Sequence, residues 1–329
     1  MTVLDQETRD LFDRTVRAVL AQGEGGDRTE ALEESGWRDV LLTDRRAAVP
    51  LVFRAQGELR ARSAALDDVA IDAIGPDAGA RFDELDGAAW VHPSPGHGPA
   101  ARADGQYVVV DGLALRGHGA TRVAMLASRD GGASLVTLMA GALELTPVAG
   151  MDPTLGLVRL RGRAPAVSSS TDPMSLTAVE AACRRAISYE LLGLASTMLA
   201  MASEYAGARV QFGQPIGVFQ SVKHRLADVF VAVRAAEVVA DESWDALSEP
   251  DAELAVAATK CLAGRAGRVA AENCLQVMGA IGFTEEHVLH RFIARATVLD
   301  VLYGSARSLR ADLGRMLLAR GTMPRLGLP

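Results

Sequence analysis

The sequence "RVQFGQPIGVFQ", residues 209–220, lies between two long segments in which apolar residues recur with helical spacing. The segment before it carries the stripe Ile187, Leu191, Leu194, Met198, Met201 and Tyr205. The segment after it carries the stripe Val222, Leu226, Val229, Val233 and Ala236. This spacing predicts two amphipathic helices, so residues 209–220, the first string, are the connection between them.

The first string contains more charged, amide and aromatic side chains than a connection between two helices requires. Its two glycines and its proline suffice for a tight turn under which aromatic rings pack, so a purely structural role is one interpretation. That interpretation does not explain why Arg209, Gln211 and Gln220 cluster there. Arg209 can bind an anionic phosphate, and Phe212 and Phe219 can form the walls of a site for a flat ring system.

Two further segments complete a helical C-terminal region. Residues 251–279 are rich in alanine and have a helical pattern. A fourth stripe consists of Val298, Leu302, Ser305, Leu309 and Leu313. Four long helices with short connections make a bundle, so we expect a C-terminal four-helix bundle over residues 169–329.

The remaining sequence predicts two smaller domains. Residues 1–85 have the pattern of short helices, with an interruption expected near Pro50. Residues 86–168 contain short β-branched or alternating segments bounded by glycine and aspartate, which is typical of a small β-barrel or β-sandwich. The expected fold class is therefore mainly α with a small middle β-domain.

The composition excludes several classes of protein. The net charge of −7 provides no basic surface for nucleic acid. The three cysteines have no zinc-ligand spacing, and reduced thiols fit a cytoplasmic location. This cysteine spacing leads us to expect no metal site. We expect no signal peptide, because the N-terminus "MTVLDQETRD" has no basic region followed by an apolar stretch. We expect no membrane partner, because an apolar run of about 18 residues is missing.

A second string, "ENCLQVMGAIGFTEE" at residues 272–286, has a similar ambiguity. It can be the C-terminus of a helix that ends at Gly279 or Gly282. It can also be a ligand site, in which Gln276 donates hydrogen bonds and the small residues Gly279 and Ala280 let a ligand approach the backbone. This string alone does not distinguish a structural helix C-terminus from a ligand site.

The two strings together resemble the signature pair of the C-terminal bundle in the acyl-CoA dehydrogenase family. The first string matches the family at Arg209, Gln211, Phe212, Gly213, Pro215, Ile216, Phe219 and Gln220. The second matches it at Gln276, Val277, Gly279, Gly282 and Phe283, with Ala280 in place of a glycine. The resemblance is clear over about residues 174–329, and the order of helices, β-unit and bundle extends it to the whole chain.

The resemblance implies an FAD-dependent oxidation of an acyl-CoA to the trans-2-enoyl-CoA. In the family, a carboxylate removes the α-proton while the β-hydride passes to the flavin. The two strings reach across a subunit interface and hold the pyrophosphate and adenosine end of an FAD whose flavin ring lies mainly in the neighbouring subunit. The implied cofactor-binding residues are Arg209, Gln211, Phe212, Ile216, Phe219, Gln220, Gln276, Val277, Gly279 and Ala280.

The chain departs from the family at the catalytic base. Tyr303 stands where the family usually has a glutamate, and Cys183 stands at the alternative glutamate position before Arg184. A phenol with a pKa of about 10 is a poor substitute for a carboxylate, so no catalytic residue is assigned. Arg184 aligns with a family arginine that contacts acyl-CoA, and it is either a substrate-binding residue or a partner in an ion pair.

The chain also departs from the family in the loops that contact the flavin within the same subunit. Residues 91–100, "VHPSPGHGPA", and 112–121, "GLALRGHGAT", replace hydroxyl-rich and tryptophan-containing strings of the family. The half-site that a subunit lends to its neighbour is therefore kept, while the half-site and base that it uses itself are degraded.

This asymmetry predicts a non-catalytic subunit that is paired with a homologous, glutamate-bearing catalytic chain. The family contains such heteromers, often α2β2 heterotetramers, among actinobacterial dehydrogenases of steroid-derived CoA thioesters. We therefore expect an acyl-CoA dehydrogenase complex of lipid metabolism, in steroid degradation or fatty acid β-oxidation, with FAD shared between subunits. This chain alone is expected to be inactive.

Two alternatives remain open. The chain can be a self-sufficient homo-oligomeric dehydrogenase with a displaced base such as Glu190, although Glu190 is expected to be a solvated or paired surface carboxylate. It can also be a purely structural assembly subunit. Lys260 is expected on a helix surface, and His92, His97 and His118 lie in loops with no sign of a metal site.

Overall fold

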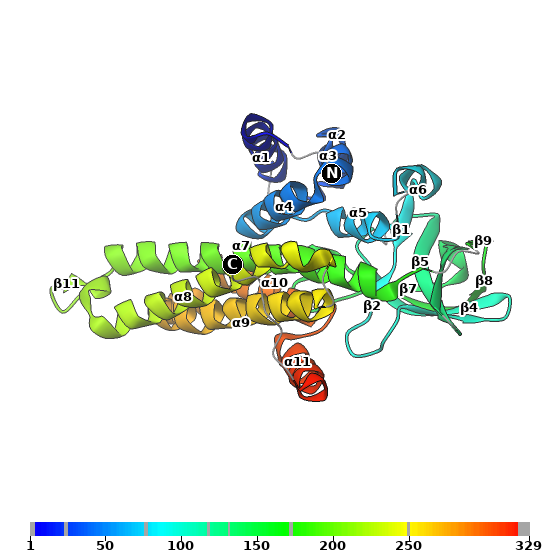
Figure 1. Ribbon diagram of the computed structural model, residues 1–329. Coiled ribbons are helices and arrows are strands. Elements are labelled where there is room, and N and C mark those ends of the chain that lie inside the picture. The colour runs from blue at the N-terminus through cyan, green and yellow to red at the C-terminus, as the bar shows by residue number, and fades with distance from the viewer. Residues whose placement is uncertain are drawn as a thin grey trace. The chain divides into compact units, whose positions relative to one another are not determined.

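The computed structural model describes residues 4–22, 26–75, 78–116, 119–130, 132–170, 174–248 and 251–321. Contacts divide the chain into two compact units (Figure 1). The mixed unit comprises Met1–Val49 and Arg62–Cys183, and the helical unit comprises Pro50–Ala61 and Arg184–Pro329. The division into three domains at residues 85 and 168 stays a prediction.

The N-terminal part of the mixed unit consists of short helices. They are α1 (Gln6–Leu20), α2 (Thr29–Glu34), α3 (Trp37–Thr43), the start of α4 (Arg45–Leu59), α5 (Ala65–Asp72) and α6 (Ala78–Glu84). The interruption expected near Pro50 is wrong, because Pro50 lies inside α4. Proline removes one backbone hydrogen bond, and the complete burial of Val52 and Phe53 in the next turn favours a continuous helix.

The rest of the mixed unit is a mixed β-sheet. Its strands are β1 (Ala88–Trp90), β2 (His92–Pro93), β3 (Ala101–Asp104), β4 (Tyr107–Ala114), β5 (Arg122–Arg129), β6 (Gly132–Met139), β7 (Glu144–Pro147), β8 (Val158–Pro165) and β9 (Ser168–Ser169). The order is β7-β8-β4-β3-β5-β6-β9, with β1 pairing with β5 and β2 pairing with β4. Val123 and Met125 of β5, with Leu138 of β6 and Leu160 of β8, lie in one apolar core.

The helical unit is built from long helices. They are α7 (Leu176–Ala208), α8 (Gln220–Glu242), α9 (Ala252–Met278), α10 (Leu289–Val301) and α11 (Ala306–Arg320). A short hairpin of β10 (Val210–Gln211) and β11 (Gln214–Pro215) joins α7 to α8. The helix α9 packs against α8, α10 and α11. The predicted fold class, mainly α with a small β-domain, is confirmed.

The prediction of one continuous fourth helix is wrong. Its stripe from Val298 to Leu313 is broken between α10 and α11, where Tyr303 and Gly304 have φ values of 56° and 104°. These left-handed conformations end α10, and Ser305 starts α11 by accepting a hydrogen bond from the Ser308 N–H at 3.1 Å. Residues on both sides of the break face the core, so the apolar period continues although the helix does not.

Two glycines let α4 and α7 approach closely inside the helical unit. A Cβ atom added at Gly57 would lie 2.1 Å from the Glu190 carbonyl oxygen, and one added at Gly193 would lie 2.3 Å from the Arg54 carbonyl oxygen. The Thr197 hydroxyl also donates to the Glu58 carbonyl at 3.3 Å. The second half of α4 is therefore an integral part of the helical unit.

The helix α7 is the one described helix whose length and composition would allow it to cross a membrane. Its most apolar window has a mean hydropathy of 1.2, and 67% of that window is buried inside the molecule. Helices in the core of a soluble protein have the same composition, because they too are surrounded by apolar side chains.

Candidate functional site

The first string forms the hairpin between α7 and α8, at one end of these helices in Figure 1. Gln211 pairs with Gln214, so Phe212 and Gly213 are the two residues of the turn. Both have positive φ values, 53° and 78°, as a tight hairpin turn of this length requires. Glycine adopts this conformation freely, whereas a phenylalanine in it is strained.

The side chains of the first string lie at the surface. Arg209, Gln211 and Gln220 are exposed, and Ile216 and Phe219 are half-buried. Phe212 is 92% exposed and meets the Phe219 ring edge to face, with 6.1 Å between ring centroids. An aromatic residue that is held in a strained conformation and exposed to water does not stabilise the core, which favours a binding role for it.

The second string ends α9. Gln276 and Ala280 are exposed, and Val277 is buried. Gly279 has φ 65° and ψ −141°, a conformation open to glycine, and a Cβ atom added there would meet no atom within 4 Å. Phe283 is 72% exposed. The helix end therefore presents an open stretch of backbone beside an exposed amide and an exposed ring.

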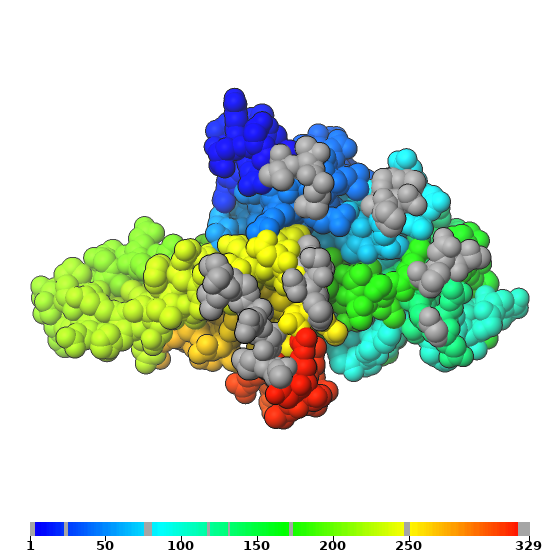
Figure 2. Space-filling model, in the orientation of Figure 1, coloured from blue at the N-terminus to red at the C-terminus, as the bar shows by residue number. Residues whose placement is uncertain are grey.

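The two strings lie at the same end of the helical unit. The helices α8 and α9 are antiparallel, since Arg225 donates to the Asn273 side chain at 3.0 Å and Thr259 donates to the Val239 carbonyl at 3.3 Å. This register brings the start of α8 level with the end of α9. In Figure 2 the hairpin and the adjoining part of α8 form the yellow-green outer surface of the unit.

The residues at this end fit part of a dinucleotide such as FAD. Arg209 could supply a cation for a phosphate, the glutamines could supply amide donors, and the backbone at Gly279 is open to close approach. These side chains are exposed rather than enclosed, so they can contact one side of a ligand and leave the other side for another surface. The sequence predicted this group of residues, and the structure brings its members to one end of the unit.

Tyr303 lies in the turn between α10 and α11. Its side chain is buried, and its carbonyl accepts a hydrogen bond from Arg184 Nε at 2.9 Å. Lys260 Nζ donates to the carbonyls of Asp300 at 2.8 Å and Gly304 at 3.2 Å. Two cationic side chains therefore hold the backbone around Tyr303, the position at which the resemblance predicts a glutamate.

The expectation that Lys260 lies on a helix surface is wrong. Its side chain is completely buried, and burial lowers the pKa of its ammonium group to about 8. The physical reason is the break after α10, whose carbonyl groups no longer accept helical hydrogen bonds and instead accept them from Lys260. Sequence spacing around Lys260 gives no sign of this tertiary contact.

The other two candidates from the sequence have different environments. Arg184 is half-buried and is occupied in part by the Tyr303 carbonyl, and its role toward acyl-CoA stays a prediction. Cys183 is completely buried, and all three cysteines are free thiols. Among the described residues, no group of three or more histidine, cysteine or acidic residues lies close enough to hold a metal ion.

Glu190 lies in the interior of the helical unit, so the expectation of a surface carboxylate is wrong. It accepts a hydrogen bond from Gln56 Nε2 at 2.8 Å and lies 3.4 Å from an Arg295 guanidinium nitrogen. The same Arg295 donates to the Ala61 carbonyl at 2.9 Å. Both of these partners occupy the Glu190 carboxylate, so it is poorly placed to take up a proton from a substrate.

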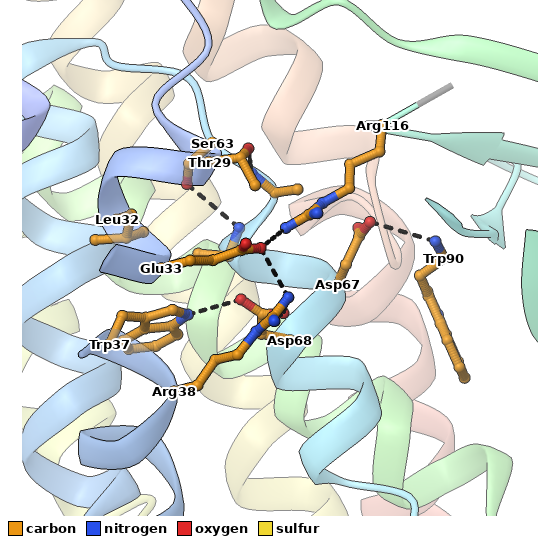
Figure 3. A network of polar contacts seen from close by, with 12 residues as sticks. Thr29, Leu32, Glu33, Trp37, Arg38, Ser63, Asp67, Asp68, Trp90 and Arg116 are labelled. Atoms are coloured by element: carbon orange, nitrogen blue, oxygen red, sulfur yellow. Dashed lines mark hydrogen bonds and ion pairs between the residues drawn. The ribbon is translucent and has the colours of Figure 1, made fainter. Parts of the chain in front are cut away.

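The mixed unit contains a polar network that the sequence did not predict (Figure 3). The Trp37 indole donates to Asp68 at 2.9 Å, and Arg38 pairs with both Asp68 and Glu33. Arg116 also pairs with Glu33. Burial raises the pKa of Asp68 to about 6, against the opposing charges of the two arginines. Acidic residues within the otherwise apolar run "LDDVAID" of α5 are the signal that could have revealed it.

The segments that replace the flavin-contacting strings of the family border this network. The expectation that His92 lies in a loop is wrong, because His92 lies in β2 and pairs with Leu113 of β4. The His92 ring nitrogen Nε2 lies 2.9 Å from Asp67, and both residues are buried, whereas His97 is exposed. His118 lies outside the described residues. An open cavity of about 430 Å³ beside Arg116 is lined by Asp27, Thr29, Glu30, Arg62, Gly87, Arg116, Gly119 and Ala120. Its arginines are paired internally, Arg62 with Asp27 and Arg116 with Glu33.

Comparison with known proteins finds a matching family domain and similar sequences. Residues 181–318 match the C-terminal domain of the acyl-CoA dehydrogenases. The chain is 36% identical over 166 residues to the acyl-CoA dehydrogenase IpdE2 of Mycobacterium tuberculosis, a match that covers 50% of this chain and 47% of the relative. The matched part thus spans about half the length of that curated relative.

Solved structures extend the likeness to the whole chain. A chain of the ChsE4-ChsE5 complex from Mycobacterium tuberculosis superposes with a TM-score of 0.75 at 23% identity, covering 98% of this chain and 99% of that one. The Tcur3481-Tcur3483 steroid ACAD variant superposes with a TM-score of 0.77 at 20% identity, covering 96% and 98%. At these identities the structures show a shared fold. The chain therefore contains the C-terminal domain of the acyl-CoA dehydrogenases and shares its fold with these structures.

Proposed function

We propose that this chain is the non-catalytic subunit of a heteromeric, FAD-dependent acyl-CoA dehydrogenase. The two strings would hold the pyrophosphate and adenosine end of FAD, while a homologous glutamate-bearing chain supplies the base. The cofactor would accept the β-hydride of an acyl-CoA as that base removes the α-proton. We infer an α2β2 assembly in the cytoplasm and a steroid-derived acyl-CoA as the substrate class.

The observation that carries this proposal is the surface location of the two strings. Arg209, Gln211, Gln220 and Gln276 are all exposed at one end of the helical unit. Phe212 is strained and almost fully exposed beside them. A cofactor held by these groups would remain open on its other side, where a second chain can enclose it.

The environment of the expected base position supports the same proposal. Tyr303 is buried, and its backbone is fixed by Arg184, with Lys260 holding the flanking carbonyls. Cys183, at the alternative position, is buried as well. Neither residue offers an accessible carboxylate, so proton abstraction is left to the partner. The printed names of similar structures, a ChsE4-ChsE5 complex and a steroid ACAD, support a two-chain enzyme and a steroid-derived substrate.

A self-sufficient enzyme that uses Glu190 as its base is the weaker alternative. Glu190 is buried against Arg295 and Gln56, and these partners occupy its carboxylate and leave it poorly placed to reach a substrate proton. A purely structural subunit would not require a strained, exposed phenylalanine or an open glycine at the end of α9, although it remains an outcome of the experiment below.

The test is co-expression with homologous glutamate-bearing chains, followed by a flavin absorption spectrum and acyl-CoA turnover of the purified complex. We expect a yellow, active complex and a chain that is colourless when made alone. Arg209→Ala is expected to lower the affinity for FAD by about tenfold or more, since a charge-assisted contact to phosphate is lost. Arg307→Ala, which removes an exposed arginine of α11, is the matched control.

Two results would contradict the proposal. A homo-oligomer of this chain that is yellow and active without a partner would establish a self-sufficient enzyme. An Arg209→Ala complex with unchanged flavin affinity would favour a purely structural subunit. Addition of FAD in increasing concentration separates weakened binding from loss of assembly, because only weakened binding is rescued.

A further inference from the structure

The small residue Gly217 lies in the short helical turn η3 (Ile216–Val218), between the hairpin and α8. Its φ value lies outside the left-handed region, so the backbone conformation does not require a glycine here. A Cβ atom added at Gly217 would lie 3.1 Å from the Ala206 carbonyl oxygen and 3.3 Å from the Ala206 carbonyl carbon. The absence of a side chain therefore serves the close approach of η3 to the last turns of α7.

This close approach fixes the backbone of Arg209. The Ile216 N–H, next to Gly217 in the chain, donates to the Arg209 carbonyl at 2.8 Å. The Arg209 N–H donates to the Tyr205 carbonyl of α7, also at 2.8 Å. Arg209 is thus held on one side by the end of α7 and on the other side by η3. Because both contacts are made by main-chain atoms, a shift of η3 moves the point from which the Arg209 side chain extends.

A side chain at position 217 would change this arrangement. Carbon atoms in contact prefer a separation of about 3.5–4.0 Å. An alanine Cβ would lie closer than this to the Ala206 carbonyl carbon, and a contact with the main chain is not relieved by a side-chain rotation. Ala206 is buried in α7, whereas Gly217 is only half-buried. We therefore expect η3 to be the part that moves, by a few tenths of an ångström.

We propose that Gly217 is a positioning residue of the FAD half-site. Its lack of a side chain sets the distance between η3 and α7, and this distance presents the Arg209 guanidinium to the phosphate of the cofactor. The inference rests on the proposed function, and Gly217 acts through Arg209 rather than by touching the cofactor. A group that is held in its binding geometry beforehand loses less freedom when the ligand binds, so this arrangement raises the affinity for FAD.

The experiment measures the affinity of the FAD-free, co-expressed complex for FAD by equilibrium dialysis. Gly217→Ala is expected to raise the Kd about threefold or more, because the guanidinium is displaced from the phosphate. Gly217→Val should raise it about tenfold or more, since the larger side chain moves η3 further. Gly207→Ala is the matched control, because its Cβ would meet no atom within 4 Å although it lies next to Ala206.

Two further measurements separate positioning from a structural role. In an Arg209→Ala background, Gly217→Ala should change the Kd by less than about 1.5-fold, because the group through which it acts is gone. The melting temperature of the FAD-free complex should be the same for Gly217→Ala and the wild type. Turnover of the Gly217→Ala complex at saturating FAD should return to the wild-type rate, since only binding of the cofactor is weakened.

Three results would overturn the inference. In the first, Gly217→Ala keeps the wild-type affinity while Arg209→Ala lowers it, which leaves the proposed function intact. In the second, Gly217→Ala weakens FAD binding equally with and without the Arg209 side chain. In the third, the weakened binding is accompanied by a lower melting temperature of the FAD-free complex, which would assign Gly217 a structural role alone. If neither Gly217→Ala nor Arg209→Ala changes the affinity, the proposed half-site fails as well.

Discussion

The Arg295 guanidinium lies 3.4 Å from the Glu190 carboxylate, and both side chains are buried in the helical unit. Arg295 also donates to the Ala61 carbonyl, and Gln56 donates to Glu190. This buried pair therefore joins α7 and α10 to the segment Pro50–Ala61, which is more than a hundred residues away in sequence.

Glu190→Gln is expected to destabilise the chain by about 3–5 kcal/mol, because it leaves the buried Arg295 charge without its anion. Urea unfolding followed by circular dichroism measures the change. The double variant Glu190→Gln/Arg295→Met should recover part of the loss, since no buried charge remains. A Glu190→Gln variant of unchanged stability would show that the pair contributes little.

Gly193→Ala is expected to destabilise the chain by about 2–4 kcal/mol, because the new Cβ would meet the Arg54 carbonyl oxygen at 2.3 Å. Gly314→Ala in α11 is the matched control, since its Cβ would meet nothing within 4 Å. Alanine in place of a helical glycine stabilises by roughly 0.5–1 kcal/mol, so the two variants should shift the melting temperature in opposite directions. Shifts of the same sign would contradict the close approach of α4 and α7.

Asp68 is expected to make the stability of the mixed unit depend on pH. Burial raises its pKa from 3.8 to about 6, so the folded state holds this proton more tightly than the unfolded chain does. Its stabilising contribution is complete below pH 3.8 and is lost as the pH rises through about 6.

The comparison with Asp68→Asn isolates this contribution, because asparagine does not titrate. Relative to that variant, the wild-type free energy of unfolding should fall by on the order of 3 kcal/mol between pH 4 and pH 7. Urea unfolding followed by tryptophan fluorescence reports it, since the Trp37 indole donates to Asp68. A difference that does not change with pH would contradict the raised pKa.

Phe212→Asn is expected to raise the stability of the chain by about 1 kcal/mol while weakening FAD binding in the complex. Asparagine followed by glycine suits a turn in which both φ values are positive, and Phe212 is too exposed for its removal to open a cavity. Differential scanning calorimetry and flavin content measure the two effects. A gain in stability with unchanged flavin affinity would remove Phe212 from the proposed half-site.

Local patterns in the sequence predicted the fold class and the location of the two strings. Helical spacing identifies α7, α8 and α9, and the glycines and proline of residues 209–220 indicate the corner between the first two. The strings are local because a hairpin and a helix end each arise from consecutive residues. Their arrival at one end of the unit follows from the antiparallel packing of α8 and α9.

The buried polar groups were not predictable in the same way. Lys260 and Glu190 have the sequence surroundings of surface residues. However, Lys260 contacts the carbonyls of Asp300 and Gly304, and Glu190 pairs with the side chain of Arg295. The break at Tyr303 was missed because the apolar period continues through it. These features depend on contacts between distant segments, which residue spacing does not encode.

The helix α4 begins in the mixed unit and ends in the helical unit, and this limits how the protein can be divided. A fragment that starts at residue 169 would contain α7 to α11 but lack Gln56, Gly57 and the Ala61 carbonyl. It would expose the surface of α7 at Gly193 that contacts α4, and it would leave Glu190 and Arg295 without two of their hydrogen-bond partners. The bundle is therefore not an interchangeable module, and recombination between related genes would preserve it only if the segment Pro50–Ala61 travelled with it.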